Sequence, residues 1–122
     1  MRIEEVSNRS GLSQDTIRFY EKSGMLPTID RDGRGWRQFS PEDLDWLTVL
    51  ERLRATGMPL KAVRAFAASA HGPNAETEAE QKKRLTLLQE HAQVLSKRRA
   101  KLDECEAYLN HKINIYTSIL EG

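Results

Sequence analysis

The sequence predicts an all-α fold with a small β-wing, in which a winged helix-turn-helix precedes a long C-terminal coiled-coil dimerisation helix. Three observations lead to this prediction. A short basic helical segment ends at Gly24, a glycine-hinged basic segment follows at 28–39, and leucines recur in heptads from 76 to 120. The 122 residues suffice for one domain with an appendage. We expect residues 1–70 to form the winged domain, 71–75 a linker and 76–122 the dimerisation helix.

Composition excludes several classes of protein. Charged residues make up 30% of the chain and hydrophobic residues 39%, which favours a helix-rich protein with a modest core. No apolar run reaches the roughly 18 residues of a transmembrane helix, and residues 1–5 lack the apolar centre of a signal peptide. The single cysteine, Cys105, allows neither an internal disulfide nor a cysteine-only metal site. We therefore expect a cytoplasmic protein without a membrane partner, a metal or a cofactor.

Two short helices joined by a tight turn are expected at the N-terminus. The first covers 3–10, and Gly11 marks the turn. Ser13 is a good N-cap for the second helix, since its hydroxyl can accept a hydrogen bond from a free backbone N–H. Ile17 and Tyr20, with Phe19, are expected to supply the inner face of this helix. Such a pair of helices is typical of a helix-turn-helix.

A hairpin wing is expected at 28–39. Gly33 and Gly35 permit a tight turn, and Trp36 and Phe39 are expected to anchor the strands. The net charge of the chain is only +1, but the segment 31–37 carries three arginines against one aspartate. A local basic patch of this kind is enough for many small DNA-binding proteins.

Two further helices and a long one follow the wing. Ser40, Pro41 and Asp43 form a capping-box start, and Gly57 ends that helix. A second helix is expected from Pro59 to about Ala70. From 76 to 120 no glycine or proline occurs, and apolar residues alternate at spacings of three and four for about five heptads. The expected dimerisation residues on this seam are Leu88, Leu95, Arg99, Leu102, Glu106, Leu109, Ile113 and Tyr116.

A single helix cannot bury such a seam on itself, so we expect a homodimer. Arg99 and Glu106 interrupt the apolar seam at its middle. Our hypothesis is that they face each other across an antiparallel dimer and fix its register.

The chain resembles the MerR family of transcription regulators. The motifs that match cover the first seventy residues in order: Gly11-Leu12-Ser13, Thr16-Ile17-Arg18-Phe19-Tyr20-Glu21, Gly24-Met25-Leu26-Pro27, Gly35-Trp36-Arg37-Gln38-Phe39 and Gly57-Met58-Pro59-Leu60. The resemblance implies a homodimer joined by an antiparallel coiled coil. It further implies an activator that binds double-stranded DNA at a pseudo-palindromic promoter operator. There the dimer distorts an overlong spacer so that RNA polymerase engages both hexamers, which is indirect readout used for regulation.

The resemblance also implies which residues contact DNA. Gln14, Thr16 and Arg18 are expected to read base edges or adjacent phosphates, Tyr20 to contact a phosphate, and the wing to contact the backbone. Lys61 is expected to add a phosphate contact at the start of its helix. The full expected set is Ser13, Gln14, Thr16, Arg18, Tyr20, Arg31, Arg34, Trp36, Arg37 and Lys61.

The sequence does not identify an effector. The segment from Met58 onward is most similar to the aldehyde and nitrosative-stress branch, yet the position of that branch's helix cysteine is occupied here by Arg52. Cys105 is a weak effector candidate, and we expect an ordinary helix cysteine. We expect that any small effector binds near the helix junction at 57–75 or along the coiled coil, or that no effector exists. No catalytic constellation is visible, so an enzyme is not expected.

Two alternatives remain open. One is an architectural DNA-bending protein such as a recombination accessory factor, and the other is a coiled-coil interaction protein. A gel shift on the upstream region of the gene tests DNA binding, and a reporter with an overlong promoter spacer distinguishes a regulator from a bender.

Overall fold

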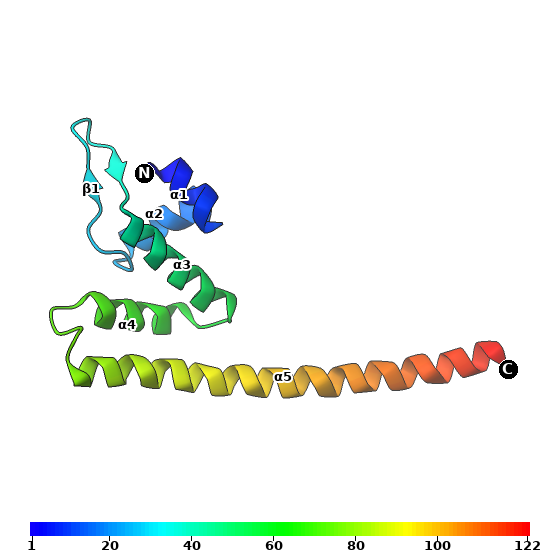
Figure 1. The fold of residues 1–122 in the computed structure, drawn as a ribbon. Coiled ribbons are helices and arrows are strands. Elements are labelled where there is room, and N and C mark those ends of the chain that lie inside the picture. The colour runs from blue at the N-terminus through cyan, green and yellow to red at the C-terminus, as the bar shows by residue number, and fades with distance from the viewer. The chain divides into compact units, whose positions relative to one another are not determined.

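The computed structural model describes residues 1–122 and contains five helices and a two-stranded sheet (Figure 1). The elements are α1 (Ile3–Ser10), α2 (Gln14–Lys22), β1 (Asp30–Arg31), β2 (Arg37–Gln38), α3 (Pro41–Ala55), α4 (Leu60–His71) and α5 (Glu78–Glu121). The chain divides into two compact units, Met1–Leu87 and Leu88–Gly122. The predicted all-α fold with a small wing is confirmed.

The helix-turn-helix forms because local signals set both of its boundaries. Gly11 ends α1 with a φ of 76°, in the left-handed region that favours glycine, and its N–H bonds the Ser7 carbonyl. Ser13 then caps α2, where its Oγ accepts a hydrogen bond from the Thr16 N–H at 3.1 Å. Both features follow the prediction, and together they place α2 directly after a tight turn.

The wing is an antiparallel hairpin in which Asp30 pairs with Gln38 and Arg31 pairs with Arg37. Each strand has only two residues, so the ladder alone gives little stability. Asp32 organises the turn, because its Oδ1 accepts hydrogen bonds from the backbone N–H groups of Arg34 and Trp36 at 2.8 and 3.1 Å. These two bonds hold the pKa of the Asp32 carboxyl below its usual value. The turn contacts are therefore complete near neutral pH and are lost only as pH falls through that lowered pKa.

The next two helices begin and end as predicted. Ser40 and Asp43 form the capping box of α3: the Ser40 Oγ accepts from the Asp43 N–H, and the Asp43 carboxylate accepts from the Ser40 N–H. The Trp46 indole of α3 donates a hydrogen bond to the Met25 carbonyl at 2.7 Å and so fixes the loop after α2. The His71 ring at the end of α4 meets the Trp46 ring edge-on at 4.4 Å, and partial burial lowers the pKa of His71.

One hydrophobic core joins these elements, and two aromatic side chains lie outside it against expectation. The core comprises Val6, Ile17, Tyr20, Met25, Leu26, Ile29, Phe39, Leu47, Leu50, Met58, Val63 and Ala67. Phe19 is 44% exposed, because it follows the buried Ile17 by two residues, about 200° around the helix. Trp36 is 50% exposed and precedes β2, so Phe39 and Ile29, rather than Trp36, anchor the wing in the core. The expected inward role of Phe19 is therefore wrong. Trp36 does not anchor the wing in the core, and its exposure is compatible with the contact to DNA that the family resemblance implies.

A polar cluster closes the corner between α4 and α5. Ser69, which is almost fully buried, donates from its hydroxyl to the Glu80 carboxylate at 2.7 Å. Arg84 donates to the Ser69 carbonyl at 3.0 Å and to the Ala75 carbonyl at 2.8 Å. The first turns of α5 thus lie beside α4 (Figure 1), and both belong to the compact unit Met1–Leu87.

The long C-terminal helix is confirmed as one unbroken element of 44 residues. Its apolar seam residues are exposed in the single chain, among them Leu95, Leu102, Leu109, Ile113 and Tyr116. No helix of the structure is long and apolar enough to cross a lipid bilayer.

Candidate nucleic-acid interface

The N-terminal half of α2 presents polar side chains that are held in place by bonds along the helix. Arg18 donates to the Asp15 carboxylate at 3.2 Å and to the Gln14 side-chain oxygen at 3.3 Å. The Ser13 hydroxyl donates to the Thr16 hydroxyl at 2.8 Å. Ile17 on the opposite face is fully buried, so the core fixes the rotation of the helix. Guanidinium and amide groups presented in this way are the side chains that read guanine and adenine edges in the major groove.

The base of the wing is tied to α2 by one carboxylate. Glu21 accepts a 2.5 Å hydrogen bond from the Arg37 Nε, and its other oxygen lies 4.0 Å from Arg31. Arg31 also donates to the Gly35 carbonyl at 2.9 Å. Because both arginines share one carboxylate, they retain excess positive charge while their positions relative to α2 are restricted.

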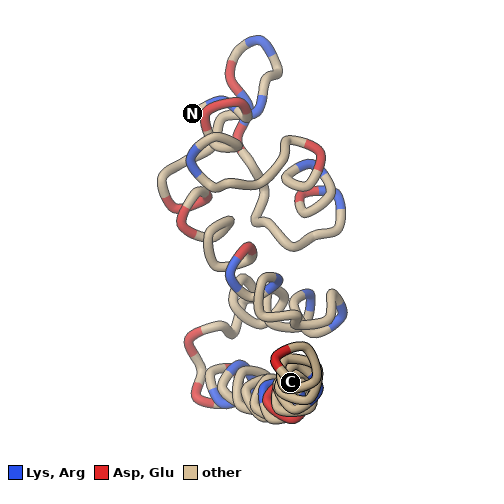
Figure 2. The backbone as a smooth tube through the Cα atoms, turned by 90° about the vertical axis from the view of Figure 1, so that its right-hand side faces the viewer, with Lys and Arg blue, Asp and Glu red and all other residues tan.

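Arginines from three segments surround a hollow of about 290 Å³ beside the wing. Figure 2 shows basic positions at the tip and along the lower part of the wing loop, next to acidic ones. Glu4 is the carboxylate among the lining residues, against four guanidinium groups. The lining residues are Arg2, Ile3, Glu4, Arg18, Arg31, Gly35, Trp36 and Arg37. The hollow therefore suits an anionic group such as a phosphate.

The other expected contact residues lie in different settings. Arg34 is exposed at the wing turn, and Lys61 is exposed in the first turn of α4, whose N-terminus has no side-chain cap. Tyr20 is 5% exposed and belongs to the core, with its ring 6.1 Å from that of Phe19. Its burial reflects the spacing of three from Ile17, which puts both on the inner face. The structure therefore assigns Tyr20 a packing role, and only its hydroxyl end could serve the expected phosphate contact.

Sequence reasoning assigned no role to Glu21 or Arg2. Glu21 lies within a motif that carried the family resemblance, yet its pairing with Arg37 joins residues 16 apart in the sequence. Arg2 precedes the first helix and has no periodic pattern around it. Both roles depend on tertiary contacts, for which the sequence has no local signal.

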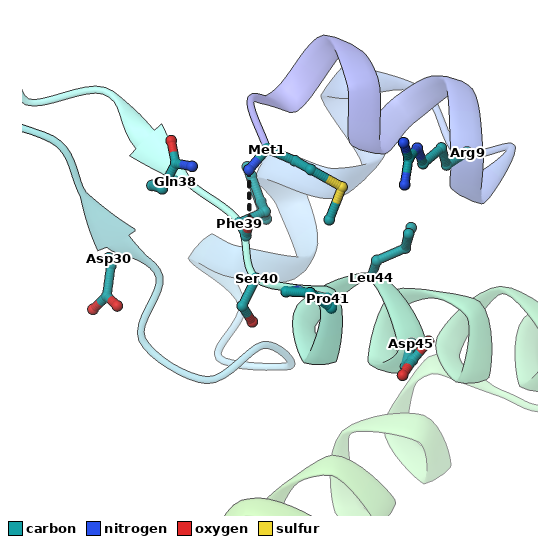
Figure 3. Close-up of a pocket in the computed structure, with 9 residues that line it drawn as sticks. All are labelled: Met1, Arg9, Asp30, Gln38, Phe39, Ser40, Pro41, Leu44 and Asp45. Atoms are coloured by element: carbon teal, nitrogen blue, oxygen red, sulfur yellow. Dashed lines mark hydrogen bonds between the residues drawn. The ribbon is translucent and has the colours of Figure 1, made fainter.

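Two further hollows lie away from this surface. One of about 540 Å³ is lined by residues of α1, the wing strands and the start of α3, including Met1, Arg9 and Leu44. Figure 3 shows the Met1 side chain extending toward Leu44, and the Met1 amino group donating to the Phe39 carbonyl at 2.8 Å. A smaller hollow of about 150 Å³ adjoins Ser69 and Glu80, within the region where an effector was expected. Cys105, the weak effector candidate, is exposed on α5.

The winged helix-turn-helix with its basic face defines a class, the DNA-binding transcriptional regulators. Residues 1–70 match the model described as MerR HTH family regulatory protein, and residues 44–112 match that described as MerR, DNA binding. The chain therefore belongs to the MerR family of DNA-binding transcription regulators.

Individual relatives agree with this assignment. A MerR family transcriptional regulator from Listeria monocytogenes has a similar structure, with a TM-score of 0.82 and 34% identity over 95% of this chain and 85% of that one. A second solved structure, HiNmlR, is described as a MerR family regulator lacking the sensor domain, bound to promoter DNA. Its TM-score is 0.78, with 31% identity over 96% of this chain and 90% of that one.

Among curated proteins, an uncharacterised HTH-type transcriptional regulator from Haemophilus influenzae is 44% identical over 63 residues. That match covers 52% of this chain and about half, 47%, of the relative.

Proposed function

We propose that the protein works as a homodimer that binds a pseudo-palindromic promoter operator and distorts an overlong spacer, so that RNA polymerase engages both promoter hexamers. The observation that supports this most is the seam of α5. Leu102, Leu109 and Tyr116 are 68%, 60% and 62% exposed on a single 44-residue helix. A stripe of apolar residues at heptad spacing requires a second helix to cover it. A second copy of the same chain supplies one without any further partner.

Dimerisation brings two copies of the DNA-contact residues onto one operator. One helix-turn-helix recognises a short sequence, and two copies related by a two-fold axis recognise a palindrome. We propose that α2 enters the major groove with Ser13, Gln14, Thr16 and Arg18, while the wing and Lys61 contact phosphates. The wing residues concerned are Arg31, Arg34, Trp36 and Arg37. Since this work takes place on the chromosome, the proposed location is the cytoplasm.

The proposal also includes distortion of the promoter DNA. Its support is membership of the MerR family and the likeness to a family regulator that was solved bound to promoter DNA. Deforming DNA costs several kcal/mol, of the order of 1–6 for bends of 40–90°, and the contacts that the bend permits offset that cost. A dimer braced at both half-sites can supply such contacts on either side of the bend.

The charged pair in the seam provides a test of the dimer. Arg99 and Glu106 are both exposed in the single chain. If they face each other in an antiparallel dimer, Arg99→Glu and Glu106→Arg should each weaken dimerisation, and the double variant should restore it. Sedimentation equilibrium measures the effect. Single variants that dimerise like the wild type would show that the two residues do not meet.

DNA binding itself is tested with fragments from the upstream region of the gene and from neighbouring genes. We expect a gel shift that survives excess unrelated DNA. Absence of a specific shift on all these fragments would contradict the proposal and favour the coiled-coil interaction protein.

A further inference from the structure

The residue before α1 lies against the wing. The guanidinium carbon of Arg2 is 3.8 Å from the centre of the Trp36 ring, within the range of a cation–π contact. Its Nη2 lies 3.8 Å from the Asp32 Oδ2. Trp36 remains 50% exposed despite this contact. Arg2 therefore stacks on an aromatic platform, and its side chain is still 40% exposed to solvent.

Asp32 links the turn of the wing to the Arg2 side chain. Its Oδ1 already accepts from two backbone N–H groups of the wing turn, and its Oδ2 faces Arg2. The Asp32 N–H donates to the Trp36 carbonyl at 2.9 Å, which closes the same turn. The turn that holds Asp32 thus also fixes the position of Trp36, and the two side chains together hold Arg2 at the side of the wing.

Arg2 lines a hollow whose other residues carry excess positive charge. The guanidinium groups of Arg2, Arg18, Arg31 and Arg37 line the 290 Å³ hollow, and Trp36 and Glu4 line it too. Arg37 and Arg31 are restrained by Glu21, and Arg18 by α2. Arg2 is restrained by stacking instead, which leaves hydrogen-bond donors at the edge of its planar guanidinium group.

We propose that Arg2, presented by Trp36 and Asp32, binds a DNA backbone phosphate at this hollow and thereby joins the segment before α1 to the wing in one contact. This inference rests on the proposed operator binding and adds a residue outside both the helix-turn-helix and the wing. An arginine already ordered by stacking loses less side-chain entropy on binding than a free one. Arg2 thus provides a pre-positioned cation between the two parts of the DNA-binding unit.

The test is the salt dependence of operator binding. Loss of one phosphate contact should lower the slope of log affinity against log salt by about 0.9, and should weaken all DNA sequences alike. Arg2→Gln removes this contact from both subunits of the dimer, so the slope should fall by about 1.8 and the affinity at low salt by about a hundredfold, the size of two charge-assisted hydrogen bonds. Arg2→Lys keeps the charge without the planar stack, so it should retain the slope and recover part of the affinity.

Arg9→Gln is the matched control. It removes the same charge from the other end of α1, where Arg9 pairs with Glu5 at 2.8 Å. Its salt slope should equal that of the wild type. Arg2→Gln and Trp36→Leu should be non-additive when combined, because Trp36 presents Arg2. Circular dichroism of each variant controls for folding.

The outcomes separate this inference from the proposed function. Suppose that the wild-type protein binds its operator and that Arg2→Gln keeps the wild-type salt slope. The proposed role of Arg2 is then overturned, whether or not affinity falls, while the proposed operator binding stands. An equal loss of slope in Arg9→Gln overturns it as well, since the effect would then be one of net charge. Inorganic pyrophosphate is expected not to displace the operator at millimolar concentration. Displacement that is lost in Arg2→Gln would identify a site for free phosphate compounds and overturn the assignment to DNA.

Discussion

Replacing Leu102 and Leu109 with glutamate is expected to convert the protein into a monomer and to abolish operator binding. Both leucines lie on the seam of α5 and are exposed in the single chain. In a dimer the double variant removes four buried leucines, each worth about 1.5–3 kcal/mol, and places four like charges in the seam. The leucines alone account for about 6 kcal/mol or more, a factor of roughly 10⁴ in the dimerisation constant.

The control for this experiment adds the same charges on the outer face of the same helix. Ala100 and Ala107 each follow a seam position by one residue and are exposed. Ala100→Glu with Ala107→Glu should leave a dimer of twice 14.0 kDa, measured by sedimentation equilibrium. Operator binding, measured by gel shift, should follow the dimer in both variants. If Leu102→Glu with Leu109→Glu still dimerises, α5 does not associate through the proposed seam.

The second large effect is expected at the base of the wing. Phe39 is 2% exposed, and its backbone N–H and carbonyl are both bonded to Met1. Phe39→Ala should lower the free energy of unfolding of the N-terminal unit by about 3–5 kcal/mol, through lost burial and the cavity left behind. Small domains are stable by only about 5–15 kcal/mol in total, so this loss removes a large share of the stability of the winged domain.

Phe19→Ala is the matched control, because it makes the same change at a side chain that is 44% exposed. We expect a loss below about 1.5 kcal/mol, since little area is buried and little cavity forms. Both tryptophans of the chain, Trp36 and Trp46, lie in the N-terminal unit. Tryptophan fluorescence during urea unfolding therefore reports on that unit alone. Equal losses for the two variants would contradict the packing described for the wing.

The boundaries of the helices could be predicted because their signals are local. Ser13 and Ser40 cap helices by bonding to the backbone three residues on, and Gly11 allows the left-handed conformation that ends α1. The absence of glycine and proline between 76 and 120 likewise predicted one long helix, and the structure has it at Glu78–Glu121. Each cap involves residues within about one helical turn of one another, and the long helix follows from composition along a single continuous segment.

Contacts between distant segments could not be predicted. The composition of 28–39 gives no indication that Trp36 stacks on Arg2 rather than entering the core. The bonds from Arg84 to Ser69 and Ala75 depend on the fold of the 71–77 corner. Glu21 acquires its role only because the hairpin returns Arg37 to α2.

In the candidate DNA-binding site, too, the burial of side chains could be predicted from local spacing. Hydrophobic spacing predicted the burial of Ile17, and it equally predicts that of Tyr20, which the family resemblance had favoured as a phosphate contact. The remaining DNA-contact residues and the dimer seam stay predictions, supported by exposure, charge and membership of the family.

The most direct test of the central claim is transcription from the bound promoter in a reporter strain, with and without the protein. One version keeps the native spacer, and the other has a spacer shortened to the length that RNA polymerase engages unaided. We predict that the protein raises transcription from the native promoter, and that the shortened promoter is active alone and no longer stimulated by it. Equal stimulation of both promoters, or none of either while the protein remains bound, would contradict regulation through promoter distortion.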